Sequence, residues 1–331
     1  MENFKYEPIN LERPSLRLLR LLKGEEPDNV ECELFQAYLD GDDLIPYHAL
    51  SYTWGGTEMS SAVIVNGRRL GVTENLELAL QYLRSREMDR ILWVDAICID
   101  QGNKSERGHQ VQQMGNIYSQ AEEVIVWLGP ATYATNVLMD SLTKLKDKSL
   151  GSACRNWNPA DIRWNNLWRS VQPSLMDEYT SLTTLQHRGL ELLLSRPWFK
   201  RVWILQEVVN AKRAVVQSGK RSIPAYIFAL APLLLQTRPE DHSQAVLDIM
   251  PGPVRKNSWW SEKRNLYTLL QKFSKSEASD PRDRVYALLG ISSDAFDARS
   301  LRPDYNKNIQ HVINNTAAFL FGSSTVSRAI V

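Results

Sequence analysis

The sequence contains few cysteines and no arrangement of them that would hold a small fold together. Only three occur in 331 residues, namely Cys32, Cys98 and Cys154. They are far apart and odd in number, and no C-x-x-C pair is present. This usage argues against a disulfide framework and for a reducing compartment. We therefore expect a cytoplasmic protein that depends on a hydrophobic core, for which a hydrophobic content of 43% is ordinary.

The chain also lacks an excess of charge of either sign and lacks long apolar runs. Its 39 basic and 38 acidic residues give a net charge of +1, which provides no electrostatic reason to expect nucleic acid or an anionic membrane as a partner. No apolar run approaches the roughly 20 residues that span a bilayer, and the charged N-terminus has no secretory signal core. The sequence therefore predicts neither nucleic-acid binding nor a membrane-spanning segment.

Signatures of common cofactor and metal sites are missing as well. The pairs Gly55-Gly56 and Gly129-Pro130 do not form a G-x-G-x-x-G motif or a phosphate-binding P-loop. The five histidines show no metal-ligand spacing, and none accompanies a cysteine in a recognisable dyad. We expect no metal site and no required cofactor.

Short apolar runs that alternate with helical patterns are the main feature of the sequence. Strands are expected at 47–54, at 91–101, where the run ends in a polar rim, and at 124–128, with an amphipathic helix between the last two. Strand, helix and strand joined by short links predict parallel crossovers and an α/β sheet. Alternating residues at 15–21 and 30–36 predict a β-hairpin before this core, and Asn66-Gly67 predicts the turn of a second one.

The later part of the chain is expected to be mainly helical. A helix that begins at Pro197 and continues to Val209 would place Phe199, Trp203 and Glu207 on one face. An apolar helix is expected from Pro224 to Leu235, followed by a polar surface linker through Pro253 and by further helices.

Six short phrases, spread over most of the chain, carry a resemblance to a known family. They are Tyr47–Gly55 (YHALSYTWG), Leu92–Gln101 (LWVDAICIDQ), Arg107–Ala121 (RGHQVQQMGNIYSQA), Val124–Gly129 (VIVWLG), Arg196–Glu207 (RPWFKRVWILQE) and Asp280–Gly290 (DPRDRVYALLG). With these phrases in this order, the chain resembles the fungal heterokaryon incompatibility, or HET, domain family. The core of the resemblance extends from about Tyr47 to Glu207.

The resemblance implies a role in non-self recognition between fungal strains and in the cell death that follows incompatible fusion. It also implies a distant relation to TIR domains, flavodoxin-like α/β folds that act as assembly modules and, in some members, cleave NAD+. We therefore expect a mostly parallel, TIR/flavodoxin-like sheet flanked by helices, self-association on activation, an unidentified incompatibility partner and NAD+ as a candidate substrate. Fold alone does not fix function, so a non-enzymatic signalling scaffold and a nucleotide-binding sensor without turnover stay open as alternatives.

Three regions are expected along the chain. They are an N-terminal β-hairpin extension over residues 1–46, a HET domain over 47–210 with an insertion at about 131–195, and a mainly helical C-terminal extension over 211–331. Many members of the family continue well beyond this length, so Val331 is either the natural end of a short form or a truncation point.

Glu207 is the candidate catalytic residue. The resemblance implies a catalytic glutamate four residues after a tryptophan, and Trp203 and Glu207 have that spacing. A carboxylate near the ribose of NAD+ can orient its hydroxyls and stabilise the positive charge of an oxocarbenium-like state. The alternative is a structural role, in which Glu207 pairs with Arg201, Lys212 or another arginine while Trp203 fills the core.

The loop after the first core strand supplies candidate substrate-binding residues. Ser51, Tyr52, Trp54 and Gly55 follow one another there and can line a nucleotide pocket together with Trp203. For Trp54 the alternative is a plug of the hydrophobic core.

Further candidate binding residues lie at the polar end of the 91–101 run. Asp95, Asp100, Gln101 and Arg107 are placed where ligands gather in parallel sheets, at the carboxyl ends of the strands. Asp95 can instead be a buried carboxylate satisfied by backbone amides or by Arg107. Asp100 can cap the following loop with help from Gln101 and Asn103, and Arg107 can form a salt bridge rather than bind phosphate.

Overall fold

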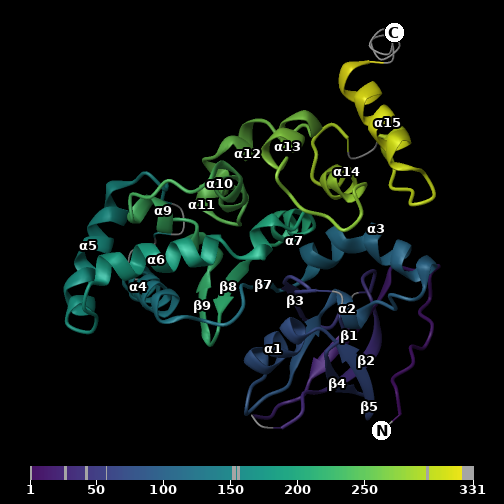
Figure 1. Cartoon of the computed structure of the whole chain (residues 1–331), viewed down its shortest axis with the longest axis horizontal. Helices are drawn as coiled ribbons and strands as arrows, with labels where there is room; N and C mark the ends of the chain where they lie inside the picture. Colours follow the sequence, from purple (N-terminus) through teal and green to yellow (C-terminus); the bar gives the residue numbers. More distant parts are fainter. Residues whose placement is uncertain are drawn as a thin grey trace.

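The computed structural model describes residues 2–25, 28–41, 44–56, 58–150, 154, 157–295 and 298–322, so Val331 lies outside the described residues. These residues form one nine-stranded sheet with strand order β5-β4-β2-β1-β6-β3-β7-β8-β9 (Figure 1). The strands are β1 (Ser15–Leu21), β2 (Glu31–Tyr38), β3 (His48–Ser51), β4 (Ser61–Val65), β5 (Arg68–Val72), β6 (Arg90–Trp93), β7 (Glu123–Trp127), β8 (Ala214–Ser218) and β9 (Arg221–Pro224).

The centre of the sheet is parallel. Strands β6, β3, β7 and β8 run in one direction, with Ser51 of β3 opposite Val126 of β7. Their order along the chain is β3, β6, β7, β8, so their spatial order is 2-1-3-4, as in flavodoxin-like sheets. The expected α/β class is confirmed. In such sheets ligands bind at the carboxyl ends of the strands beside the first strand, which here is the end of β3.

Both expected hairpins are confirmed, and both extend this sheet. Strands β1 and β2 pair antiparallel, and β1 also pairs with β6. Strands β4 and β5 are joined by Asn66 and Gly67, whose φ angles of 50° and 73° suit the two central positions of a tight hairpin turn. The N-terminal strands therefore share the core of the sheet, and Leu16, Leu18 and Leu19 of β1 are fully buried.

Side-chain caps mark the starts of two helices in the first half of the chain. Helix α1 (Glu74–Leu83) begins after Thr73, whose side chain accepts the backbone N–H of Leu76. Helix α3 (Lys104–Gln120) begins after Asn103, whose side chain accepts two backbone N–H groups of the first turn. Each cap satisfies donors that the helix itself leaves unpaired.

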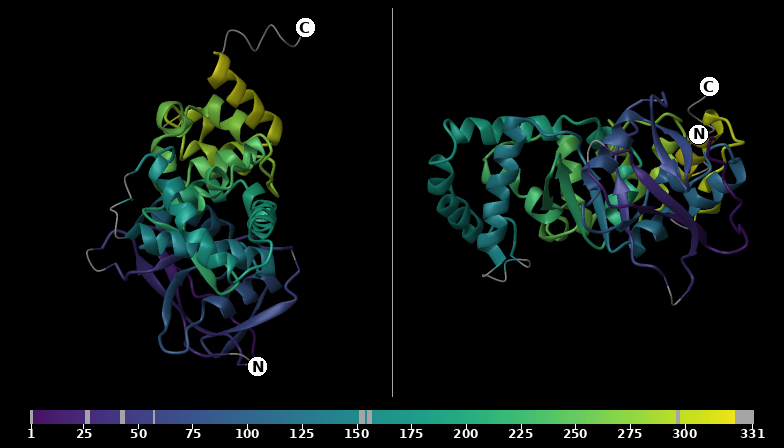
Figure 2. Two further views of the ribbon diagram at one scale, coloured as in Figure 1. Left: turned by 90° about the vertical axis from the view of Figure 1, so that its left-hand side faces the viewer. Right: turned by 90° about the horizontal axis from the view of Figure 1, so that it is seen from below.

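Helices make up most of the remaining chain. Residues 133–194 form α4 (Tyr133–Leu150), α5 (Ile162–Met176) and α6 (Leu182–Leu194), which lie at one end of the molecule with the N-terminal strands at the other (Figure 2). The C-terminal part contains α8 (Ala225–Phe228), α9 (Ala231–Leu234), α10 (Asp241–Asp248), α11 (Pro253–Lys256), α12 (Trp259–Glu262), α13 (Leu266–Lys272), α14 (Asp283–Leu289), the 3-10 turn η3 (Arg299–Leu301) and α15 (Ile309–Phe321).

The expected strand at 91–101 is wrong beyond Trp93. Strand β6 covers Arg90–Trp93 only, and a one-turn helix, α2 (Asp95–Cys98), follows. A short apolar run that is buried on all sides has no periodicity to separate strand from helix. The polar rim of the expected strand is therefore a helix start at Asp95 and a separate loop at Asp100.

The expected helix from Pro197 to Val209 is also wrong as a single element. A 3-10 turn, η2 (Pro197–Lys200), and helix α7 (Ile204–Asn210) are separated by residues 201–203, of which Arg201 is extended (φ −68°, ψ 127°). Arg201 forms an isolated parallel bridge with Glu277. This contact with a distant part of the chain overrides the local helical pattern.

Two expectations for 224–253 are likewise wrong. The apolar stretch after Pro224 forms two short helices, α8 and α9, instead of one. The expected surface linker contains helix α10, whose Val246 and Leu247 are fully buried. Packing against the rest of the protein determines the structure of both segments, since short helices are only marginally stable in isolation.

Candidate functional site

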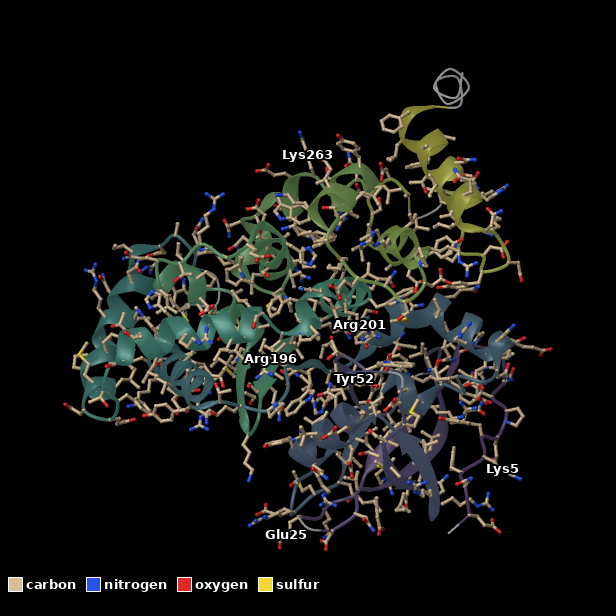
Figure 3. All side chains as sticks on the ribbon, viewed as in Figure 1. Lys5, Glu25, Tyr52, Arg196, Arg201 and Lys263 are labelled. Carbon is tan, nitrogen blue, oxygen red and sulfur yellow. The ribbon has the colours of Figure 1, made fainter. Side chains whose placement is uncertain are left out.

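Buried polar side chains gather at the carboxyl end of β3. Ser51 is the last residue of β3 and Tyr52 follows it, and both are at most 1% exposed. Asp95 comes from the start of α2, Glu207 from the first turn of α7 and Arg201 from the segment between η2 and α7. These five residues are called the Arg201 cluster below. Figure 3 shows Tyr52 and Arg201 where α7 meets the sheet.

Arg201 connects the acidic members of the Arg201 cluster. Its Nη2 lies 3.1 Å from Asp95 Oδ2, and its Nη1 lies 3.3 Å from Glu207 Oε1. Nη1 also donates to the backbone oxygen of Tyr52 at 2.7 Å. The planar guanidinium carries five N–H donors in a fixed fork, which suits three acceptors at once. Arginine is therefore the residue that ties α2, α7 and the end of β3 together.

The backbone of residues 200–203, called the strap below, is extended at Arg201, and this explains how the Arg201 side chain reaches the cluster. Val202 N–H donates to Glu277 O at 2.9 Å, and Glu277 N–H donates to Lys200 O at 2.6 Å. These two hydrogen bonds, made on either side of Arg201, hold Arg201 itself in a strand-like conformation. The side chain of Arg201 then lies over the end of β3.

Asp95 is a well-satisfied carboxylate at the start of α2. Its Oδ1 accepts the backbone N–H of Ala96 at 2.8 Å, and its Oδ2 accepts the indole N–H of Trp54 at 3.1 Å as well as Arg201. Gln101 Nε2 donates to the backbone oxygen of Asp95 at 3.0 Å. The predicted backbone-amide partner is thus confirmed, but the arginine that pairs with Asp95 is Arg201.

Glu207 is the most perturbed acid of the cluster. Its side chain is 1% exposed, and burial raises its pKa to about 7, although Arg201 opposes this shift and Asp95 adds to it. Oε2 makes no hydrogen bond of normal geometry to any described residue. One guanidinium serves two buried carboxylates, so protonation of Glu207 leaves the trio uncharged overall. Glu207 can therefore exchange a proton near neutral pH, as general acids and bases do.

Aromatic residues enclose the cluster. The indole N–H of Trp198 donates to Ser51 Oγ at 2.8 Å, and Tyr118 OH donates to Leu50 O at 3.2 Å. Burial raises the pKa of both Tyr52 and Tyr118, so both phenols stay protonated. In this conformation the aromatic side chains exclude water from Glu207.

Other predicted binding residues have different partners. Asp100 Oδ1 accepts the N–H of Gly102 at 3.0 Å, which confirms its predicted role as a loop cap. Arg107 is exposed; the side-chain hydrogen bond from Arg282 is the main cause of the lowered pKa of Asp280, and the charge of Arg107 adds to it. The indole N–H of Trp203 donates to Asp283 Oδ2 at 3.0 Å. The spacing of Trp203 and Glu207 therefore does not direct both side chains to the same partners.

Gly55 is exposed and adopts a φ of 78°, which favours glycine. A Cβ at Gly55 would lie 3.0 Å from Cβ of Asn75, whose side chain holds the same loop by donating to Thr53 O. Gly55 thus shapes the loop that carries Trp54 to Asp95.

The sequence interpretation missed the organising role of Arg201. It named Arg201 only as one partner that Glu207 could have, and it placed Trp198 and Tyr118 in no site. The available signal was a cation six positions before the glutamate in the same phrase. Its position over β3 depends on Glu277, and nothing local to the phrase indicates that contact.

A surface groove lies elsewhere, over strands β1, β2 and β4, with Arg20, Glu33, Phe35 and Ile64 among its lining residues. No group of three or more His, Cys, Asp and Glu side chains that could hold a metal ion occurs in the part of the chain that the structure describes.

Within the same described ranges, no helix is both long and apolar enough to cross a membrane.

Comparison with known proteins assigns the domain. The sequence profile of the family described as "Heterokaryon incompatibility protein (HET)" matches residues 47–207, the stretch that holds the whole Arg201 cluster. "Heterokaryon incompatibility protein 6, OR allele" of Neurospora crassa is 27% identical over 365 aligned residues, which cover 95% of this chain and 53% of that protein. The chain thus spans about half the length of this curated relative. No solved structure matches the chain significantly. Residues 47–207 of the chain thus match the heterokaryon incompatibility (HET) family.

Proposed function

We propose that this chain is an effector of fungal heterokaryon incompatibility that triggers cell death after non-self recognition. The family match over residues 47–207 and the similarity to a heterokaryon incompatibility protein of Neurospora crassa support this role. Because the chain spans about half of that relative, the role is proposed for the HET domain and the helices that pack on it. Self-association on activation is part of the proposal.

The proposed chemistry is hydrolysis of NAD+, with Glu207 as the catalytic residue. The observation that carries it is the position of Glu207, a buried carboxyl group at the switch-point edge of a flavodoxin-like sheet, where burial raises its pKa to about 7. In the reaction the bond between the nicotinamide nitrogen and ribose C1′ breaks, and its electron pair leaves with nicotinamide. Water adds to C1′ and releases a proton, which yields ADP-ribose. Glu207 would accept hydrogen bonds from the ribose hydroxyls and stabilise the positive charge at C1′.

This proposal requires the cluster to open. Glu207 is 1% exposed, and Arg201 occupies the space in front of its Oε1. A ribose can therefore reach the carboxylate only after Arg201 moves. We take the described conformation as the resting state and assembly as the event that opens it.

Nicotinamide release tests the enzymatic proposal. The purified protein, concentrated with a crowding agent, is incubated with NAD+, and nicotinamide is quantified by chromatography. Glu207→Gln keeps the size of the side chain and removes its charge. Glu106→Gln is the matched control, because Glu106 is equally buried and pairs with a single arginine, Arg17, outside the cluster.

We expect release by the wild type and by the folded Glu106→Gln variant, and none by the folded Glu207→Gln variant. Absence of release from the wild type in every assembled state would contradict NAD+ hydrolysis. Release that is unaffected by Glu207→Gln would contradict the assignment of Glu207.

A non-enzymatic signalling scaffold is the second candidate function. The observation in its favour is that Glu207 is buried and paired in the described conformation, as a structural ion pair would be. In that case the cluster fixes α7 on the sheet, and assembly itself is the signal. The scaffold predicts that the wild type forms oligomers in light scattering and causes cell death without release of nicotinamide.

A further inference from the structure

We propose that the C-terminal region is a latch on the Arg201 cluster, in which Asp283 holds Trp203 and thereby keeps Arg201 between Asp95 and Glu207. This inference rests on the proposed function, since it concerns the control of access to Glu207. Trp203 and Asp283 are positioning residues in this scheme, because they act through the strap.

The strap has partners on two sides. The side chain of Arg201 binds the carboxylates of the cluster, whereas the backbone of its neighbours Lys200 and Val202 pairs with Glu277. Lys200 and Glu277 also form an exposed ion pair with an N–O distance of 3.8 Å. The residue that closes the site and the residues that bind the C-terminal region are therefore consecutive in the chain.

Asp283 makes the side-chain contact that completes the latch. Its Oδ2 accepts the indole N–H of Trp203 at 3.0 Å, and its Oδ1 accepts the hydroxyl of Tyr305 at 2.7 Å. Arg282 donates to the backbone oxygen of Tyr305 at 2.6 Å. Asp283 is 9% exposed, so the carboxylate depends on these two donors for its hydrogen bonds. A change near Tyr305 is thus transmitted to the end of the strap.

Helix α14 contacts α7 directly as well. Gln206 Nε2 donates to Ala287 O at 3.0 Å, and a Cβ at Gly290 would lie 3.1 Å from the same nitrogen. Figure 1 shows α7 between α14 on one side and the sheet with α3 on the other. The C-terminal region therefore holds both the strap and the helix that carries Glu207.

Release of the strap has a direct consequence for the cluster. The side chain of Arg201 is 21% exposed, so its guanidinium already has a path to water, whereas Glu207 has none at 1%. Once the strap moves, Arg201 can leave with it. Asp95 and Glu207 have then lost their shared cation at the end of β3, and Glu207 can accept hydrogen bonds from the hydroxyl groups of a ligand.

A buried thiol at the cluster tests the latch without requiring turnover. Ser51→Cys replaces a fully buried hydroxyl beside Glu207, and its reaction with a thiol reagent requires the site to open. In this background, Trp203→Phe removes the indole donor and keeps an aromatic ring, and Asp283→Asn removes the charge. Trp259→Phe is the matched control, since this indole packs on Trp260 and Phe273 within the C-terminal region.

We expect labelling at position 51, mapped by peptide mass spectrometry, to become roughly ten- to a hundred-fold faster in Trp203→Phe and Asp283→Asn, as the loss of one hydrogen bond to a charged group allows. Trp259→Phe should leave this rate unchanged. The native Cys98, fully buried in the same domain, reports global unfolding and should react no faster.

Equal acceleration at position 51 and at Cys98, or no acceleration at either, would overturn the latch. If Ser51→Cys does not fold, hydrogen exchange of peptides covering 200–207 in Trp203→Phe and Asp283→Asn decides. Faster exchange there than in α3 supports the latch, and unchanged exchange refutes it. A latch that opens while NAD+ stays intact would refute only the enzymatic proposal.

Discussion

Replacement of Glu207 by glutamine is expected to change how the stability of this HET domain depends on pH. The substitution keeps the shape of the side chain and its contact with Arg201 but removes the titrating proton. Because Glu207 is 1% exposed, solvent screens the effect little. The variant therefore shows whether Glu207 is protonated in the folded state at low pH or stays ionised as in an ordinary ion pair.

The magnitude follows from the shift in pKa. Burial raises the pKa of Glu207 from 4.5 to about 7, so the folded state binds a proton that the unfolded state has already lost in this range. The free energy of unfolding therefore falls as pH rises from about 4.5 to 7. At 1.36 kcal/mol per pKa unit, the contribution of Glu207 amounts to roughly 3 kcal/mol, present at low pH and lost above pH 7.

Urea unfolding at pH 5, 6, 7 and 8, followed by tryptophan fluorescence, measures this contribution. The difference in free energy between the wild type and Glu207→Gln is expected to shift by roughly 2–3 kcal/mol in favour of the variant between pH 5 and pH 8. Asp280→Asn is the control. The side-chain hydrogen bond from Arg282 lowers the pKa of Asp280, so Asp280 is ionised above pH 5 in both the folded and the unfolded state. The difference in the free energy of unfolding between the wild type and Asp280→Asn should therefore stay constant above pH 5. A constant difference for Glu207→Gln as well would refute the reasoning.

Two further predictions concern packing and charge. Arg201→Ala leaves Asp95 and Glu207 without their shared counter-ion and should lower the free energy of unfolding by about 3–5 kcal/mol in urea; a loss below about 1 kcal/mol would show that solvent replaces the guanidinium. Gly189→Ala places a Cβ against a backbone oxygen of α4 and should cost about 1–3 kcal/mol in the same assay. Gly108→Ala in α3, where a Cβ meets open space, should instead gain up to about 1 kcal/mol, and equal losses at both glycines would contradict the packing argument.

Elements with complete local signals were predictable from the sequence. The Asn66-Gly67 turn requires positive φ at both positions, and the structure has it. Thr73 and Asn103 cap the helices that they precede. The parallel centre of the sheet followed from alternating strands and helices joined by short links. In each case a few neighbouring residues carry the physical cause.

Elements that depend on distant contacts were not predictable. The strap is extended at Arg201 because Glu277 pairs with this residue, although the local sequence favours a helix. The one-turn helix at Asp95 lies within a run whose burial hides any periodicity. Helix α10 occupies a polar stretch flanked by prolines, and its burial depends on neighbours far along the chain.

The candidate site likewise has features that were predictable from the sequence and features that were not. Ser51, Tyr52, Asp95 and Glu207 were predicted as site residues, and the structure brings them together at the end of β3. Which acid meets Glu207 was not predictable: Asp95 does so through Arg201, whereas Asp100 caps a loop. Which aspartate shares Arg201 with Glu207 depends on three-dimensional contacts of the strap, and the short sequence phrases do not indicate these contacts.

Cell death on expression in a fungal host tests the central claim, that the Arg201 cluster is the functional centre of this HET domain. Wild-type protein, Glu207→Gln and the control Glu106→Gln are expressed at equal levels, and viability is counted. We expect the wild type and the control to kill the host, whereas folded Glu207→Gln should not. Killing by Glu207→Gln at the level of the wild type would contradict it.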